Sequence, residues 1–119
     1  MAHLVGDEVL RDVTARIRAS VRDFDTVGRY GGEEFIIILE NAPLATAKNI
    51  AERVRRQVDE SPIKVKDLEI RLTLSQGLAA AHKEDDVESL LKRADAALYA
   101  AKAAGRNCVK VAEADVAAP

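Results

Sequence analysis

The segment best suited to chemistry combines two glycines, two acidic residues and an apolar residue, Gly31-Gly32-Glu33-Glu34-Phe35. It lies between two strand-like runs, Asp25–Tyr30 and Glu34–Leu39. Glycine tolerates positive φ, so a Gly-Gly pair favours a tight hairpin. A turn without side chains lets a phosphate approach the backbone, and the neighbouring carboxylates would hold a divalent cation. Taken alone, these five residues are explained better by a surface hairpin with two solvated acids.

Composition narrows the class of protein. The chain has 119 residues, 48% of them hydrophobic and 32% charged, which suits one soluble domain with a core of aliphatic residues. The net charge of -2 argues against general affinity for nucleic acid or membrane surfaces. Cys108 is the single cysteine, so no intrachain disulfide can form. Because no apolar stretch approaches the roughly 20 residues of a membrane span and no signal segment is recognisable, we expect a cytoplasmic protein or the cytoplasmic part of a larger one.

Apolar periodicity predicts two helices in the first half of the chain, over residues 7–22 and after Asn41. We expect Asn41 to cap the second helix and Pro43 to occupy its first turn. The run Phe35–Leu39 between the helices is apolar at every position, which predicts a strand buried on both faces. The apolar stripe of the second helix is expected to comprise Leu44, Ala47, Ile50, Ala51, Val54 and Val58.

The second half reads as two strands, a helix and a final strand. Residues 63–65 and 68–80 are predicted to be strands joined by a polar turn. Asp85 or Asp86 would cap the helix, which Gly105 would end. Residues 108–111 form the last strand, and residues 112–119 read as a disordered tail. The inner face of the helix is expected to comprise Val87, Leu90, Leu91, Ala94, Leu98 and Ala101.

This element order predicts an α+β fold in which helices cover a mainly antiparallel sheet. No linker or internal repeat interrupts it, so we expect one domain over residues 3–111.

Five segments together carry a family resemblance. They are, in chain order, His3–Leu10, Arg29–Phe35, Ala51–Arg55, Thr73–Gly77 and Ala94–Asn107. These segments look like the motifs GHxxGDxxL (with Ala2 where that pattern has Gly), R-x-GGDEF/GGEEF, AERIR, T-x-S-x-G and AD-x-ALY-x-AK-x-x-GRN. Each motif is weak alone, but the ordered set is highly specific. The chain therefore resembles a GGDEF domain of the diguanylate cyclase family.

The resemblance implies a ferredoxin-like sheet with flanking helices, akin to the palm of nucleotide cyclases and polymerases. It also implies a reaction in which two GTP molecules condense to cyclic di-GMP and release two pyrophosphates. Each domain of an antiparallel homodimer would hold one GTP, and Mg²⁺ (or Mn²⁺) would be the cofactor. Neither nucleic acid nor direct membrane contact is expected.

The resemblance assigns roles within the acidic turn. Glu33 matches the metal ligand beside the reacting hydroxyl and is the first candidate for a catalytic residue. Glu34 is the supporting acid. Gly31 and Gly32 would shape the turn over the α-phosphate.

Three residues outside the turn match substrate contacts of the family. Asp7 matches the residue that binds guanine, and its carboxylate suits the two adjacent donors of that base. Its alternative role is that of a helix N-cap. Lys102 and Arg106 match contacts to the terminal phosphates, although cations are also favourable at a helix C-terminus for electrostatic reasons.

Arg22 and Asp25 match the RxxD inhibitory site, which implies that they bind the product cyclic di-GMP, with Arg53 as a helper. The planar guanidinium group suits phosphate or a guanine edge. The alternative is an ordinary helix-end arginine paired with an aspartate, which contributes little at a surface.

The family's first strand and first helix, which carry another metal-binding Asp and a guanine-reading Asn, are not found before His3. We therefore expect the chain alone to be a weak or inactive cyclase with strand edges open to pairing. Two functions stay open: a cyclase domain with product feedback, or an inactive module that binds cyclic di-GMP or dimerises.

Overall fold

The computed structural model describes residues 2–31 and 33–112, with side chains from Gly6 onward. Gly32 and the predicted tail from residue 113 lie outside the described residues. The chain divides into two compact units, residues 1–73 and 74–119, and each is described by itself. None of the described helices is long and apolar enough to cross a membrane.

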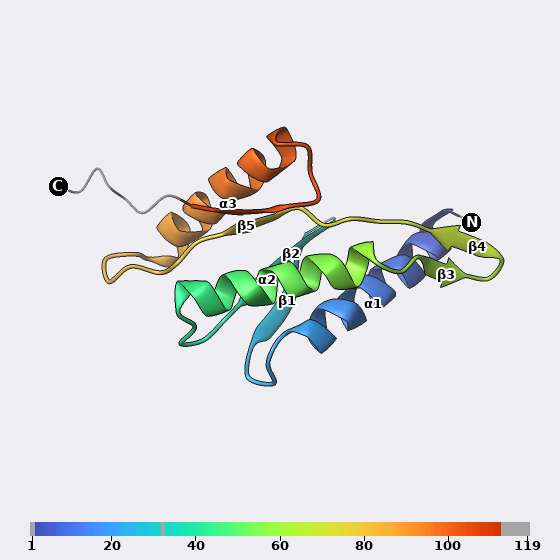
Figure 1. The fold of residues 1–119 in the computed structure, drawn as a ribbon, viewed down its shortest axis with the longest axis horizontal. Helices are drawn as coiled ribbons and strands as arrows, with labels where there is room; N and C mark the ends of the chain where they lie inside the picture. Colours follow the sequence, from blue (N-terminus) through green and yellow to red (C-terminus); the bar gives the residue numbers. More distant parts are fainter. Residues whose placement is uncertain (1, 32, 113–119) are drawn as a thin grey trace. The chain divides into compact units, whose positions relative to one another are not determined.

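The first unit contains two helices and two antiparallel hairpins (Figure 1). Helix α1 packs against α2 and against β3. Apolar residues that recur at helical spacing on both helices are buried, as that spacing predicts. The elements are α1 (Ala2–Ser20), β1 (Thr26–Gly31), β2 (Glu34–Ile38), α2 (Leu44–Asp59), β3 (Ile63–Val65) and β4 (Leu68–Ile70). Buried apolar side chains of this unit include Val13, Ile17, Val27, Ile50, Val54, Val58 and Ile63.

Two arginines join α1 and α2, because each binds backbone carbonyls at the C-terminal end of the other helix. Arg16 of α1 donates to the carbonyl oxygens of Ser61 at 2.6 Å and Pro62 at 3.1 Å, just beyond α2. Arg53 of α2 donates through Nε and Nη2 to the carbonyl of Ser20, at 2.8 and 2.5 Å. The last carbonyls of a helix have no partner within it, so a cation there supplies both hydrogen bonds and favourable charge.

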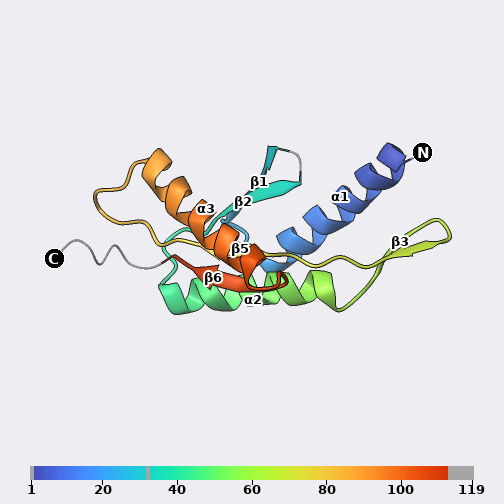
Figure 2. The ribbon, with the colours of Figure 1, turned by 90° about the horizontal axis from the view of Figure 1, so that it is seen from above.

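The second unit is a parallel strand pair packed against one helix. Strands β5 (Gln76–Leu78) and β6 (Val109–Val111) pair in parallel, and α3 (Val87–Ala103) contacts both of them (Figure 2). Asp86 caps α3 by accepting from the Ser89 backbone N–H at 2.8 Å, and Ser89 completes a capping box. Gly77 lets β5 approach α3 closely, because an added Cβ would overlap the backbone of Ala94 and Leu98.

The mixed fold of helices and mainly antiparallel strands is confirmed, but within the described residues the strands form three separate two-stranded sheets. A single strand over residues 68–80 is wrong, since residues 71–75 belong to no strand. Its first part pairs with β3 and its last part with β6, so the partner strands decide where the run is interrupted. Full burial of the run 35–39 is also wrong: Ile38 is 54% exposed.

Three local predictions need correction. Asn41 does not cap α2, since it adopts φ 50° and Pro43 is the N-cap, without a side-chain hydrogen bond. Leu44, expected in the stripe of α2, is 44% exposed. Val87, expected on the inner face of α3, is 75% exposed at the first position of the helix, whereas the predicted Ala101 is buried and so is Ala97, which was not predicted.

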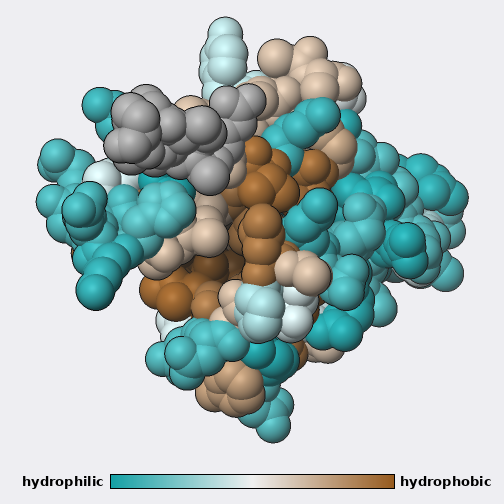
Figure 3. Space-filling model, turned by 60° about the vertical axis from the view of Figure 1, so that its left-hand side comes forward, coloured by the Kyte–Doolittle hydropathy of each residue, from teal (hydrophilic) through white to brown (hydrophobic). Residues whose placement is uncertain are grey.

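Large apolar side chains remain exposed in each unit. Tyr30 and Ile38 in the first unit are 59% and 54% exposed, and Tyr99 in the second is 77% exposed. Apolar side chains also lie open on the face shown in Figure 3. Surface of this kind is available for contact with another molecule.

Replacing Gly77 by Ala is expected to destabilise the protein by about 1–3 kcal/mol, because the new methyl group must displace helix backbone. The matched control is Gly28→Ala, where an added Cβ meets nothing within 4 Å. The free energy of unfolding from urea titrations measures both changes. Equal stability of the two variants would contradict the close contact between β5 and α3.

Stability in acid is expected to depend on Asp85. Hydrogen bonds from the His82 N–H and the Ser89 hydroxyl, together with the Arg93 guanidinium, lower the pKa of Asp85 from 3.8 to about 2. A carboxyl with a lowered folded-state pKa stabilises the fold above pH 3.8, and this contribution disappears as pH falls towards 2. The melting temperature of wild type should therefore fall further between pH 5 and pH 2 than the melting temperature of Asp85→Asn.

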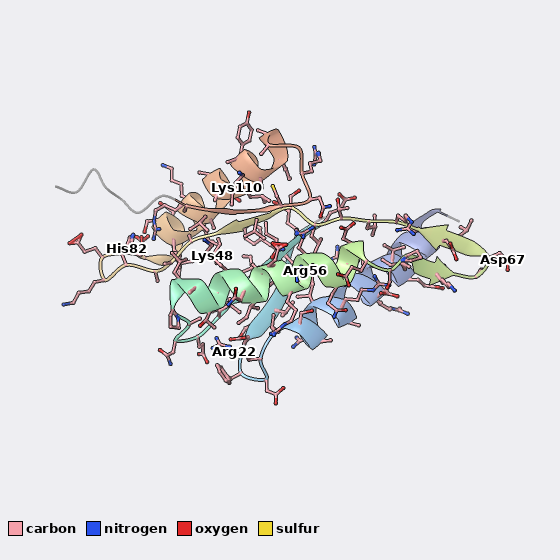
Figure 4. All side chains as sticks on the ribbon, in the orientation of Figure 1. Arg22, Lys48, Arg56, Asp67, His82 and Lys110 are labelled. Carbon is pink, nitrogen blue, oxygen red and sulfur yellow. The ribbon has the colours of Figure 1, made fainter. Side chains whose placement is uncertain are left out.

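The control for this measurement is Asp67→Asn, at the exposed β3–β4 turn, far along the chain from the loop that contains His82 (Figure 4). Asp85 lies in that same loop before α3. Asp67→Asn should keep the acid sensitivity of wild type. If Asp85→Asn keeps it as well, the hydrogen bonds to Asp85 do not contribute to acid stability.

Candidate functional site

The acidic turn connects β1 to β2. Gly28 pairs with Ile36, and Gly31 pairs with Glu34 after a shift in register. Gly31 has φ 127°, a conformation that a residue with a side chain adopts only under strain. Glu33 is exposed and Glu34 is half-buried. The tight hairpin predicted from the two glycines is therefore present at Gly31.

Asp7 lies within α1, five residues after its start, so its alternative role as an N-cap is wrong. It is exposed and borders a cavity of about 450 Å³ between α1 and β1. Arg18 holds these two elements together by donating to the carbonyl of Val27 at 3.3 Å. The residues that line the cavity are Asp7, Leu10, Arg11, Thr14, Ala15 and Arg29.

The structure brings this cavity and the acidic turn together through β1. Arg29 lines the cavity, and Gly31 begins the turn two residues later. Two residues of an extended strand span only about 7 Å. A ligand seated beside Asp7 and Arg29 therefore lies within reach of the turn.

The described residues contain no group of three or more His, Cys, Asp or Glu side chains placed to hold a metal ion. Glu33 and Glu34 thus do not form a complete ligand set by themselves.

Lys102 and Arg106 belong to the second unit. Lys102 lies in the last turn of α3, and Arg106 follows in the turn after Gly105 with φ 64°. The Arg106 backbone N–H donates to the Ala101 carbonyl at 3.0 Å, and both basic side chains are exposed. This turn presents two cations at one end of α3.

Arg22 and Asp25 form the helix-end pair that the alternative expected, but its carboxylate is buried rather than at the surface. The Asp25 carboxylate accepts from Arg22 Nε at 2.9 Å and Nη2 at 2.8 Å. The Asp25 side chain is 0% exposed, whereas that of Arg22 is 26% exposed. The guanidinium hydrogen bonds lower the pKa of Asp25, and the carboxylate raises the pKa of Arg22. Both groups are therefore held in their charged forms.

Arg22 has further partners in the loops around it. Its Nη2 also donates to the Glu40 carbonyl at 2.8 Å, and its guanidinium lies 4.5 Å from the centre of the Phe24 ring. Figure 4 shows Arg22 at the loop between α1 and β1, and Arg56 further along α2. Arg53, the expected helper, donates to the Ser20 carbonyl rather than to Asp25. The three predicted residues thus lie around the C-terminal end of α1.

Sequence reasoning missed two residues of the cavity. No role was predicted for Arg11, and Arg29 appeared only as the first residue of the motif Arg29–Phe35. The spacing of four residues between Asp7 and Arg11 was the available signal, because such residues share a helix face. No local signal indicated that Arg29 would join them.

The chain is similar to known proteins over most of its length. The family model for "Diguanylate cyclase, GGDEF domain" matches residues 2–108. The chain is 47% identical over 111 residues to the response regulator PleD of Caulobacter vibrioides, covering 90% of this chain and 24% of PleD. It is 39% identical over 112 residues to diguanylate cyclase A of Treponema denticola, covering 93% of this chain and 30% of that protein. The chain thus spans about a quarter to a third of the length of these relatives.

Solved structures show the same fold. The GGDEF domain of DgcB from Caulobacter crescentus, in complex with c-di-GMP, matches with a TM-score of 0.88 and 34% identity over 94% of this chain and 67% of that one. The GGDEF domain of YfiN (TpbB) from Pseudomonas aeruginosa matches with a TM-score of 0.85 and 34% identity, covering 96% of this chain and 72% of that one. Sequence motifs, family match and fold agree, and the chain belongs to the GGDEF domain family of diguanylate cyclases.

Proposed function

We propose that the chain is a diguanylate cyclase domain that binds GTP and condenses two molecules of it to cyclic di-GMP, at a low rate when the chain is alone. The observation that carries this proposal is the course of β1, which joins the cavity beside Asp7 to the acidic turn at Gly31. A nucleotide whose base lies in the cavity would place its phosphates near the backbone of Gly31, which has no side chain.

In the proposed reaction, the ribose 3′-hydroxyl of one GTP attacks the α-phosphorus of the other. A new phosphorus–oxygen bond forms, the bond to the β-phosphate oxygen breaks, and pyrophosphate leaves; the second step closes the ring in the same way. Two copies of the domain, each holding one GTP, would face each other as an antiparallel homodimer. Such a reaction depends chiefly on positioning, because the partners must meet in line.

The chain's own residues would divide this work. Asp7 accepts hydrogen bonds from guanine, and the turn at Gly31 receives the α-phosphate. Glu33 accepts the hydrogen bond of the attacking hydroxyl and favours loss of its proton. Glu34 is the supporting acid beside it. Lys102 and Arg106 pair with the terminal phosphates.

A divalent metal is generally used by this family of cyclases. Glu33 is the residue that we propose would bind Mg²⁺ or Mn²⁺. The cation would offset charge on the attacking and leaving oxygens.

The first test replaces Glu33 by Gln in the full chain. Its rate of cyclic di-GMP formation from GTP with Mg²⁺, measured by chromatography, is expected to fall by about 100-fold or more, as for loss of a group that assists proton transfer. The affinity for GTP should change far less. Glu69→Gln, on exposed β4, is the control and should keep the activity of wild type.

Unchanged product formation by Glu33→Gln would contradict the proposed role of Glu33. A wild-type chain that binds cyclic di-GMP but makes none would instead support the second candidate function, a binding module. The feature that favours this candidate is the cluster of Arg22 and Arg53 around the end of α1.

We further propose that Arg22, Asp25 and Arg53 bind cyclic di-GMP as an inhibitory product. The solved DgcB domain, which is in complex with c-di-GMP, supports binding of this ligand by similarity. Asp25 would act by holding Arg22 in place, since its own buried carboxylate is already saturated with donors.

Arg22→Lys and Arg53→Lys are each expected to weaken cyclic di-GMP binding by about tenfold. Lysine keeps the charge but loses the planar group that makes two parallel hydrogen bonds. Isothermal titration of the full chain measures the change, and Arg56→Lys on the same helix is the control. If only Arg56→Lys weakened binding, the ligand would lie elsewhere on α2.

A further inference from the structure

An exposed phenylalanine lies against the guanidinium group of Arg22. Phe24 is 58% exposed in the turn between α1 and β1, and the centre of its ring lies 4.5 Å from the guanidinium carbon of Arg22. A cation within about 6 Å of an aromatic ring centre is attracted by the ring. The contact of Phe24 is therefore with a charged side chain rather than with the apolar core.

The hydrogen bonds of Arg22 use three of the five N–H groups of its guanidinium. Nε and Nη2 donate to the Asp25 carboxylate, and Nη2 also donates to the Glu40 carbonyl. Among the described residues, none accepts a hydrogen bond from Nη1. Nη1 is therefore the nitrogen that can bind an acceptor of a ligand without loss of an existing hydrogen bond.

The turn that carries Phe24 is closed by hydrogen bonds between its first and last residues. The Asp25 backbone N–H donates to the Arg22 carbonyl at 3.0 Å, and the Arg22 backbone N–H donates to the Asp25 carboxylate at 2.9 Å. Because the Asp25 side chain is also 0% exposed, both ends of the turn are fixed. The backbone of Phe24 is thereby held beside Arg22, although more than half of its side chain faces solvent.

Hydrogen bonds alone leave the guanidinium some freedom to tilt, because they weaken steeply only when the donor angle falls below about 120°. The ring of Phe24 restricts the tilt that the bonds to Asp25 and Glu40 would tolerate. We propose that Phe24 is a positioning residue, which holds the Arg22 guanidinium so that Nη1 donates to an acceptor of cyclic di-GMP. This inference rests on the proposed binding of that product at Arg22. Phe24 acts through Arg22 and adds no hydrogen bond of its own.

The first experiment compares Phe24→Leu with Phe24→Tyr in the full chain. Leucine keeps an apolar side chain but removes the ring, whereas tyrosine retains the ring. A side chain that must be immobilised on binding lowers affinity, so Phe24→Leu is expected to weaken binding of cyclic di-GMP about fivefold in isothermal titration. Phe24→Tyr should bind as wild type does. Tyr99→Leu is the matched control, because it removes an exposed ring from α3, and it should also keep the wild-type affinity.

A second comparison separates positioning from direct contact between the ring and the ligand. The Arg22→Lys variant has no planar group to orient, so Phe24→Leu should weaken binding by less than about twofold further in that background. If the ring instead stacked on a base of cyclic di-GMP, the fivefold loss would persist there.

A third measurement needs no ligand. Hydrogen exchange at Nε of Arg22, followed by NMR on the full chain, reports how firmly the guanidinium is held. Phe24→Leu should raise this exchange rate by about the same factor as it weakens binding. Phe24→Tyr and Tyr99→Leu should leave the exchange rate unchanged.

The outcomes separate this inference from the proposed product site. Wild-type affinity or an unchanged exchange rate in Phe24→Leu would overturn the positioning role, and so would a fivefold loss that persists in the Arg22→Lys background. Each of these results would leave binding of cyclic di-GMP at Arg22 intact. Absence of cyclic di-GMP binding to the wild-type chain would overturn the proposed product site and the inference together.

Discussion

The first unit depends on the buried carboxylate of Asp25. Besides the guanidinium of Arg22, it accepts the backbone N–H groups of Arg22 at 2.9 Å and Glu40 at 3.3 Å. A charge removed from water is tolerated only when its acceptor positions are filled, so these donors must stay in place together. They come from the end of α1 and from the loop after β2. Asp25 itself immediately precedes β1, so one side chain fixes both ends of the hairpin that carries the acidic turn.

Because of this constraint, the basic residues around Asp25 stabilise the fold and are also the proposed ligand-binding residues. Arg22 and Arg53 already hold a carboxylate and backbone carbonyls when no ligand is present. A ligand that recruits them must offer acceptors at least as good as those it replaces. A phosphodiester with several oxygens meets this condition better than a single weak acceptor, because charged hydrogen bonds are the stronger ones. The hydrogen bonds that stabilise the end of α1 would thus make Arg22 and Arg53 selective for ligands with several strong acceptors.

Helices were predicted well and strands less well, for a physical reason. The stripe of α2 follows from spacing alone, and Ala47, Ile50 and Val58 are buried as that spacing requires. A strand also needs a neighbour, and the run 68–80 is divided because its two ends pair with different strands. Residues 70–74 still alternate between half-buried and exposed, so the periodicity was real although it did not specify a ladder. The predicted cap at Asp86 is confirmed, because a cap, like a helix, depends on contacts within one turn of chain.

The family, the order of elements, the positive φ at Gly31 and the end of α3 near Gly105 all followed from the sequence by itself. These features depend on ordered motifs and on residues close together in the chain, whose conformational preferences are local. Only the tertiary structure placed Arg29 at the same cavity as Asp7, made Asp25 inaccessible to solvent, and set Arg16 against the end of α2. Each of these contacts joins different elements. Their geometry depends on how helices and strands pack, and periodicity within one element carries no information about that packing.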